Sequence, residues 1–283
     1  MKSPAFHSQD VREPLMTAPR KLFAETVRID RLTEKDRQVM FGVFSKYYNN
    51  VEIDQFESDL LKKDVVFLLK DSQDRQIKGF STLVRLECLV EDKIVRGMFS
   101  GDTIIEKEYW GQGTLGIAFL IYLFKEKLKR PFKPLYWFLI SKGYKTYLLM
   151  ANNFSGHYPR HEKDTPTFEK KVIDIFSETL YPDSYDAAKG VISFSKVVDK
   201  DCLKQEITPI SKELLLKNRR IKFFAETNPA WEQGSELACI AEMTLSMPFY
   251  YKYKFILKKL KKVFANTRGN SLPSREQNKM GSK

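Results

Sequence analysis

The chain has 283 residues, enough for one large or two small domains, and 42% of them are hydrophobic, 13% aromatic and 30% charged. This composition excludes an intrinsically disordered protein and predicts a globular one. The net charge of +12 comes from 48 basic and 36 acidic residues, but positions 249–283 hold ten of the basic residues and one acid. We therefore expect no nucleic-acid partner for the folded body.

Local patterns exclude further classes of protein. The apolar run at 116–124 has nine residues, too few to span a bilayer, and residues 1–25 lack the apolar segment of a secretory signal. Cys88, Cys202 and Cys239 form no CxxC pair, which predicts reduced thiols rather than disulfides or a cysteine-rich zinc site. We therefore expect a cytoplasmic protein.

Hydrophobic periodicity and turn residues divide the chain into helices and strands. The first part predicts a flexible arm at 1–25, a strand at 27–32, helices at 33–48 and 53–63, strands at 65–70, 77–90 and 94–105, a helix at 117–129, a strand at 135–141 and a helix at 144–152. The second part predicts helices at 168–180 and 211–217 and strands at 190–194 and 220–227. We expect a mixed α/β fold with a largely antiparallel sheet flanked by helices.

The C-terminal segment predicts a basic amphipathic helix. Apolar residues recur at steps of three and four from Phe249 to Phe264, six lysines fill the rest of the circumference, and Pro248 suits the first turn. Three roles stay open for it: capping the core, lying on an anionic membrane surface, or binding an acidic protein. The second role would make the protein peripheral at the inner membrane face. Residues after Arg268 predict a frayed end.

One segment carries a chemical signal, between the strand predicted at 94–105 and the helix predicted at 117–129. It consists of Gly111, Gln112, Gly113, Thr114, Leu115 and Gly116. Glycines let the backbone approach a phosphate closely, and a helix N-terminus adds free N–H groups and the positive end of the helix dipole. The segment predicts either a pyrophosphate site or a turn that needs glycine at positive φ.

The same letters also spell the dinucleotide fingerprint G-x-G-x-x-G. That fingerprint requires an acid at the end of the next strand, to hold a ribose hydroxyl. Here the next predicted strand ends in Ile140, Ser141 and Lys142, without an acid. An NAD(P)-dependent oxidoreductase is therefore only a remote alternative.

The element order from residue 27 to about residue 153 resembles the GNAT superfamily of acyl-CoA-dependent N-acyltransferases. In that family a strand and two helices precede an antiparallel meander, and the fourth strand enters a pyrophosphate loop. Residues 103–113 are similar to the family's strand-to-loop segment, although Trp110 stands where the family has Arg or Gln and Leu115 where it has Gly or Ala. The resemblance implies a core at 26–160, a C-terminal elaboration at 161–247, and a basic helix and tail at 248–283.

The resemblance also implies how acyl-CoA would bind. Backbone groups of Ile104, Ile105 and Glu106 would pair with the pantetheine amides, as an added strand would. The N–H groups from Gln112 to Gly116 would bind the pyrophosphate.

No metal is expected, because His157 and His161 flank Pro159 in a predicted loop and lack further ligands; they are surface, polar-contact or catalytic histidines.

Two side chains are the expected catalytic groups. Asp102, in the fourth strand, would take the proton of the attacking amine, because burial would raise its pKa. A purely structural Asp102, satisfied by the backbone or by a lysine, is the alternative. The resemblance implies a tyrosine after the fifth strand that protonates the leaving thiolate. Tyr147 is our choice over Tyr144 and Tyr158, although packing accounts for each of them as well.

The resemblance thus implies an N-acyltransferase that moves an acyl group from acyl-CoA, or from an acyl carrier protein, to an amine by direct attack on the thioester. The alternative is a non-catalytic acyl-CoA-binding or membrane-associated module of the same fold.

Overall fold

The computed structural model describes residues 20–48, 51–194 and 209–250. The strands are β1 (Leu22–Arg28), β2 (Val65–Asp71), β3 (Ile77–Val90), β4 (Lys93–Ile105), β5 (Leu135–Ser141), β6 (His157–Tyr158), β7 (Tyr185–Asp186), β8 (Val191–Ile192) and β9 (Glu236–Glu242). The helices are α1 (Glu34–Phe44), α2 (Ile53–Leu61), α3 (Thr114–Lys129), α4 (Tyr144–Asn153), α5 (Thr167–Leu180), α6 (Lys212–Lys217) and α7 (Arg219–Thr227). Short 3-10 helices occupy Ile29–Arg31, Lys107–Tyr109 and Trp231–Gln233.

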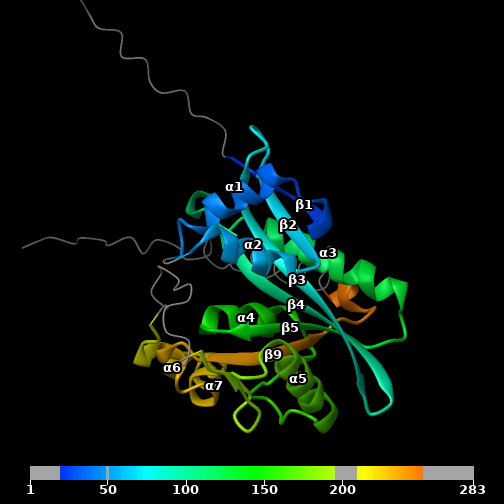
Figure 1. The fold of residues 1–283 in the computed structure, drawn as a ribbon. Coiled ribbons are helices and arrows are strands. Elements are labelled where there is room, and N and C mark those ends of the chain that lie inside the picture. Colours follow the sequence, from blue (N-terminus) through cyan, green and yellow to red (C-terminus); the bar gives the residue numbers. More distant parts are fainter. Residues whose placement is uncertain (1–19, 49–50, 195–208, 251–283) are drawn as a thin grey trace, which may run out of the picture.

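The described strands form one nine-stranded sheet (Figure 1). Its order is β1-β2-β3-β4-β5-β9-β8-β7, and β6 pairs with β9 beside this path. Among these strands β4 and β5 are the parallel pair, joined through α3, and the other neighbours are antiparallel. The expected fold class is therefore confirmed: a mixed α/β fold with a mostly antiparallel, open sheet flanked by helices.

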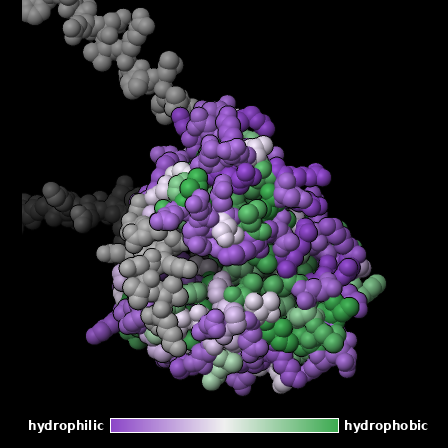
Figure 2. Space-filling view, viewed as in Figure 1, coloured by the Kyte–Doolittle hydropathy of each residue, from purple (hydrophilic) through white to green (hydrophobic). Residues whose placement is uncertain are grey.

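Helices cover both faces of the sheet. On one face, Phe80 of β3 packs under α1 and α2, while Val84 and Leu86, which alternate with it on the same side of the strand, pack under α5. The opposite face, which includes Leu83, packs against α3, α4 and α7. Figure 2 shows hydrophobic side chains over α5 and the hairpin of β3 and β4. The helices α2 and α5 therefore flank the middle of the sheet on the same face.

The N-terminal elements correct one prediction. The strand expected at 27–32 starts five residues earlier, as β1, and the 3-10 helix Ile29–Arg31 follows it directly. The arm expected at 1–25 therefore gives its last residues to β1, while residues 1–19 lie outside the described chain. Helix α1 begins as expected, because Thr33 and Asp36 form a reciprocal capping box.

Two predictions for the second part were wrong. The strand expected at 220–227 is helix α7, because the Asn218 side chain accepts from the N–H groups of Arg220 and Ile221 and caps a helix. Its buried residues, Ile221 and Phe224, are three apart, as one helix face requires. No strand was expected where β9 lies, yet β9 pairs with β5 from Tyr136↔Glu242 to Ser141↔Leu237. The segment 161–247 therefore completes the middle of the sheet.

Some predictions fall on residues that are not described. The basic helix expected from Phe249 to Phe264 lies outside the described chain after residue 250, as do the tail and Cys202. Cys88 and Cys239 are free thiols. Among the described residues no helix has the length and hydrophobicity needed to cross a membrane.

Candidate functional site

The site begins where β4 and β5 separate. Their parallel register runs from Arg96↔Leu135 to Phe99↔Phe138. Beyond it, residues 100–105 of β4 and 139–141 of β5, all of them described, do not pair with each other. Strand β5 is instead held along its other edge by β9, and β4 stays with β3 as far as Ile105. The two parallel strands therefore separate here, and no other described strand pairs with the edges that they turn toward each other.

A bulge in β4 lies at the start of this opening. The register between β3 and β4 slips by one residue between Ser81↔Thr103 and Leu83↔Ser100, so β4 carries an extra residue there. Gly101 fits this close approach, because an added Cβ would lie 2.7 Å from Thr82 Oγ1. Bulges bend the strand that carries them, which gives a physical reason for β4 to leave β5 at this point.

The glycine segment connects β4 to α3. Gly111 and Gly113 have φ of +82° and +74°, so the turn needs glycine, as one of the two interpretations of the sequence requires. The turn also leads into a helix N-terminus, as the other interpretation, a pyrophosphate site, requires. Helix α3 begins at Thr114, three residues before the expected start, with Gly113 at the N-cap and no side-chain cap. Thr114, Leu115 and Gly116 therefore form the first helical turn, where backbone N–H groups have no acceptor within the helix.

Side chains of this segment hold it against β1. Gln112 Oε1 accepts from the Leu22 N–H at 2.9 Å, and its Nε2 donates to Arg20 O at 3.0 Å. Thr114 Oγ1 donates to Leu22 O at 3.4 Å. The side chains of Gln112 and Thr114 are thus engaged within the protein, and what the segment offers to a ligand is its backbone N–H groups.

A buried pair fixes the chain between β4 and the glycines. The Tyr109 hydroxyl donates to Asp71 Oδ2 at 2.5 Å, and the side chains of both residues are almost fully buried. This hydrogen bond is the main reason that the pKa of Asp71 lies below its usual range, while burial and the carboxylate raise the pKa of Tyr109. The Trp110 indole N–H donates to Ile105 O at 2.7 Å and closes the turn.

The strand residues expected to pair with pantetheine are not equivalent. The Glu106 N–H donates to Lys78 O at 2.9 Å, and alternation along an antiparallel pair directs the backbone of Ile104 to β3 as well. Ile105 faces the opening, but its carbonyl accepts from Trp110. The backbone groups of Ile104 and Glu106 are therefore engaged within the protein, and of the three residues it is Ile105 whose N–H is directed away from β3.

Asp102 lies on the face covered by α1 and α2, but it is not buried as expected. Its side chain is 40% exposed, Lys63 Nζ lies 3.6 Å from Oδ2, and Thr82 Oγ1 donates to the same oxygen at 3.3 Å. The alternative from the sequence, an aspartate satisfied by a lysine, matches this geometry.

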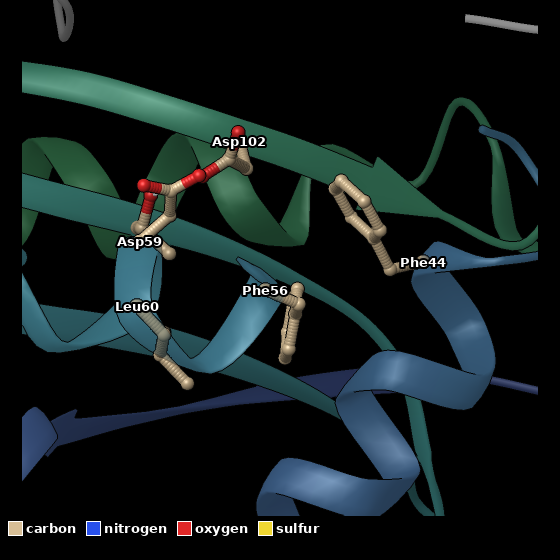
Figure 3. A pocket seen from close by; sticks show the side chains of 6 residues that line it. Phe44, Phe56, Asp59, Leu60 and Asp102 are labelled. Carbon is tan, nitrogen blue, oxygen red and sulfur yellow. Dashed lines mark hydrogen bonds between the residues drawn. The ribbon is translucent and has the colours of Figure 1, made fainter. Parts of the chain in front are cut away.

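Asp102 lines a small pocket of about 40 Å³ (Figure 3), together with Phe44, Phe56, Asp59, Leu60 and Thr82. Figure 3 shows the carboxylates of Asp59 and Asp102 on one side and the ring of Phe44 on the other. Burial raises the pKa of Asp59, but hydrogen bonds from Lys62 and Gln55 and the charges of Lys62 and Lys63 outweigh it, so the pKa lies below its usual value. The sequence analysis did not single out Asp59.

The three candidate tyrosines lie in different surroundings. Tyr147 is 1% exposed, its hydroxyl donates to Pro159 O at 3.1 Å, and burial raises its pKa strongly, which makes it a poor proton donor for a thiolate. Tyr158 packs under α5, on the other face of the sheet. Tyr144 is the first residue of α4, three positions after the end of β5, and its side chain is 8% exposed.

The histidines offer no site of their own. His157 is buried, its Nδ1 hydrogen-bonds with Phe154 O at 2.9 Å, and burial lowers its pKa. His161 Nδ1 lies 3.1 Å from Glu162. Among the described residues no group of three or more His, Cys, Asp or Glu side chains is arranged to hold a metal ion.

Another carboxylate beside the opening was missed from the sequence. Glu236 is the first residue of β9, and its neighbour Leu237 pairs with Ser141 at the end of β5. Burial raises the pKa of Glu236 to about 7. The pairing of β9 with β5, which the sequence analysis did not foresee, is what brings this residue to the site.

Comparisons with known proteins find similar chains in the search of solved structures alone. No protein-family model matches the chain, and a search of curated proteins finds no match. A probable N-acyltransferase of unknown function from Enterococcus faecalis is 16% identical over 55% of this chain and 43% of its own, with a TM-score of 0.36. A GNAT family N-acetyltransferase from Escherichia coli, solved in complex with CoA, is 14% identical over 49% of this chain and 72% of its own, with a TM-score of 0.34. An IAA acetyltransferase from Bacillus cereus is 12% identical over 53% of this chain and 85% of its own, with a TM-score of 0.32.

The chain spans less than half of the Enterococcus protein, and the TM-scores are low. The functional proposal therefore rests on the geometry of this chain.

Proposed function

We propose that the chain is an N-acyltransferase that moves an acyl group from acyl-CoA to an amine. The observation that carries the proposal is the separation of β4 from β5 after Phe99 and Phe138, directly beside a connection that ends in an uncapped helix N-terminus. An extended pantetheine arm fits between two such strands, because it can use backbone groups as an added strand does. An acyl carrier protein, which presents the same kind of thioester, is the alternative donor.

The diphosphate of CoA would lie at the first turn of α3. The N–H groups of Thr114, Leu115 and Gly116 point out of the helix N-terminus, where the dipole favours an anion. An added Cβ at Gly111, Gly113 or Gly116 would meet no protein atom within 4 Å, so this surface is open. The proposed contact needs only backbone groups, consistent with the structural use of the Gln112 and Thr114 side chains.

The reaction is a direct transfer. The amine nitrogen attacks the thioester carbonyl carbon, an N–C bond forms, the C–S bond breaks, and CoA leaves as a thiolate. The amine gives its proton to a carboxylate or a water beside one, and the thiolate takes a proton from Tyr144 or from solvent. The Ile105 N–H is a donor at the edge of the opening for the developing oxyanion.

The wider setting is also part of this proposal. Residues 26–160 would carry the CoA site, and 161–247 would complete the sheet and shape the acceptor side. Residues 249–264 would bind an anionic membrane surface, placing a cytoplasmic protein at the inner face. Liposome flotation with and without residues 248–283 tests this last point, and equal flotation of the two chains would contradict it.

Ligand-dependent melting tests the proposal. A ligand at 100 times its dissociation constant stabilises the folded state by about 2.7 kcal/mol, so CoA and acetyl-CoA should raise the melting temperature and NADPH should not. Release of free thiol from acetyl-CoA, measured with a panel of primary amines, then tests transfer. No stabilisation by CoA, or stabilisation by NADPH alone, would contradict the proposal.

One observation favours a second candidate, an acyl-CoA-binding module without catalysis. Asp102 is paired with Lys63, so the carboxylate expected to serve as the base is already partnered. Such a module would be stabilised by CoA but would release no thiol with any amine.

A further inference from the structure

We propose that Glu236, rather than Asp102, receives the proton of the acceptor amine, and that the amine reaches the thioester from the sheet face between α2 and α5. This inference rests on the proposed acyltransferase function and assigns its base. Three observations carry it: the position of Glu236 level with the end of β5, the burial of its carboxylate, and the engagement of Asp102 with Lys63.

The position follows from strand register. Ala238 pairs with Ile140 and Leu237 with Ser141, so Glu236 lies at the level where β5 ends after leaving β4. Residues 236, 238 and 240 share one face of β9, and Ala238 and Ile240 pack under α5. Glu236 therefore projects from the face that α5 and α2 flank, which is also the face of Asp102.

The surroundings of Glu236 contain few charged or titratable groups. The charge of Lys142, after β5, acts on Glu236, and the charge of Glu236 acts in turn on Tyr181, after α5. Burial raises the pKa of Tyr181, and the charges of Glu236 and Asp102 raise it further, so its phenol lies close enough to both carboxylates to interact with them. Its ring packs on Phe99, at 6.0 Å between centroids. Within the described chain, Glu236 has neither a hydrogen-bond donor nor an ion-pair partner.

A carboxylate in this setting suits proton transfer. Burial raises the pKa of Glu236 to about 7, and the charge of Lys142 opposes that rise only in part. A base with a pKa near the working pH is partly ionised and still accepts a proton strongly. Asp102, by contrast, lies beside Lys63 and is 40% exposed. Of the two carboxylates, Glu236 is therefore the better base.

In the proposed step the amine nitrogen bonds to the thioester carbonyl carbon, and one N–H proton passes to the Glu236 carboxylate, directly or through one water. The C–S bond breaks, and the electron pair leaves with the sulfur. The thiolate then takes a proton from Tyr144 or from solvent, and Glu236 returns its proton to water. No oxidant, metal or further co-reactant is needed.

The experiment compares four full-length proteins: wild type, Glu236→Gln, Glu236→Asp, and the control Glu232→Gln, which alters an exposed carboxylate four residues away. Thiol release from acetyl-CoA with a panel of primary amines is measured from pH 5.5 to 9, and CoA affinity is measured by calorimetry. We expect Glu236→Gln to lower kcat/KM by about 10²- to 10⁴-fold while CoA affinity stays within about threefold. The acid limb of the wild-type pH profile, with a midpoint near 7, should disappear. Glu236→Asp should restore part of the rate, and Glu232→Gln should behave as wild type.

Other results overturn the inference in distinguishable ways. If Glu236→Gln keeps a rate within threefold of wild type and the same acid limb, Glu236 is not the base although acyl transfer stands. If wild type binds CoA but releases no thiol with any amine, the module without catalysis is correct, and the role of Glu236 is rejected with it. If wild type does not bind CoA, the proposed function itself is wrong.

Discussion

Glu236→Gln also makes a prediction about stability that needs no substrate. Burial raises the pKa of Glu236 from 4.5 to about 7, so between these values the folded protein binds more protons than the unfolded chain. The free energy of unfolding must then fall as pH rises through this window. A difference of about 2.5 pKa units corresponds to about 3 kcal/mol, which the ionised carboxylate costs the fold above pH 8.

Glutamine cannot ionise and removes this cost. We expect Glu236→Gln to be more stable than wild type by about 1 kcal/mol at pH 5 and by about 3 kcal/mol at pH 8. Urea unfolding at both pH values, followed by circular dichroism, measures the difference. The control Glu232→Gln changes an exposed side chain and should alter stability by less than about 0.5 kcal/mol at either pH. Equal stability of Glu236→Gln and wild type at pH 8, or a gain independent of pH, would refute the reasoning.

Three further predictions concern the frame of the site. Gly113→Ala should lower the free energy of unfolding by about 1–2 kcal/mol, because φ is +74° there although the added methyl group meets no other atom, and it should weaken CoA binding in calorimetry. The control Gly116→Ala, at an ordinary φ, should cost no stability. Equal melting temperatures for the two variants would contradict this prediction. Gly97→Ala would place a Cβ 2.6 Å from Phe176 Cζ and should lower the free energy of unfolding by about 1–3 kcal/mol, measured in urea. The double variant with Phe176→Leu should lose less stability than the sum of the two single variants, and strict additivity of the losses would argue against the contact. Asn218→Ala removes the cap of α7 and should cost about 1 kcal/mol in thermal unfolding, whereas an unchanged melting curve would exclude a capping role.

Local signals in the sequence predicted much of the frame. Thr33 with Asp36 marks the start of α1, and the continuous apolar run at 135–141 predicts the buried strand β5. Such signals act within a few residues, so they can be read without knowing the fold. Such signals do not predict the element where the spacing of apolar residues fits both the two-residue period of a strand and the 3.6-residue period of a helix. In α7, Ile221, Phe223 and Phe224 fit either a strand or a helix, and the Asn218 cap decides for the helix.

Strand β9 was missed for a different reason. Its sequence, Glu-Leu-Ala-Cys-Ile-Ala-Glu, has one β-branched residue and two alanines, so its intrinsic strand preference is weak. What makes it a strand is pairing with β5 on one edge and with β8 on the other. This tertiary pairing also places Glu236, so the residue that we propose as the base could not have been found from local patterns.

The candidate site was predicted in outline. The two glycines at positive φ are where the motif placed them, and the helix that follows begins three residues earlier than expected. The roles of Gln112 and Asp102 depended on partners remote in sequence: Arg20 and Leu22 hold Gln112, and Lys63, two residues after α2, lies 3.6 Å from the Asp102 carboxylate. Sequence spacing located the glycine turn and the start of the following helix to within three residues, but the engagement of side chains requires the fold.

Hydrogen–deuterium exchange with and without CoA tests the central claim most directly. The N–H groups of Thr114, Leu115 and Gly116 have no acceptor within α3, and the Ile105 N–H faces the opening between β4 and β5, so all four should exchange quickly in the free protein. If CoA binds as proposed, saturating CoA slows exchange in peptides covering 103–117 and leaves α5 unchanged. Unaltered exchange in 103–117, or protection confined to another part of the chain, would contradict the account.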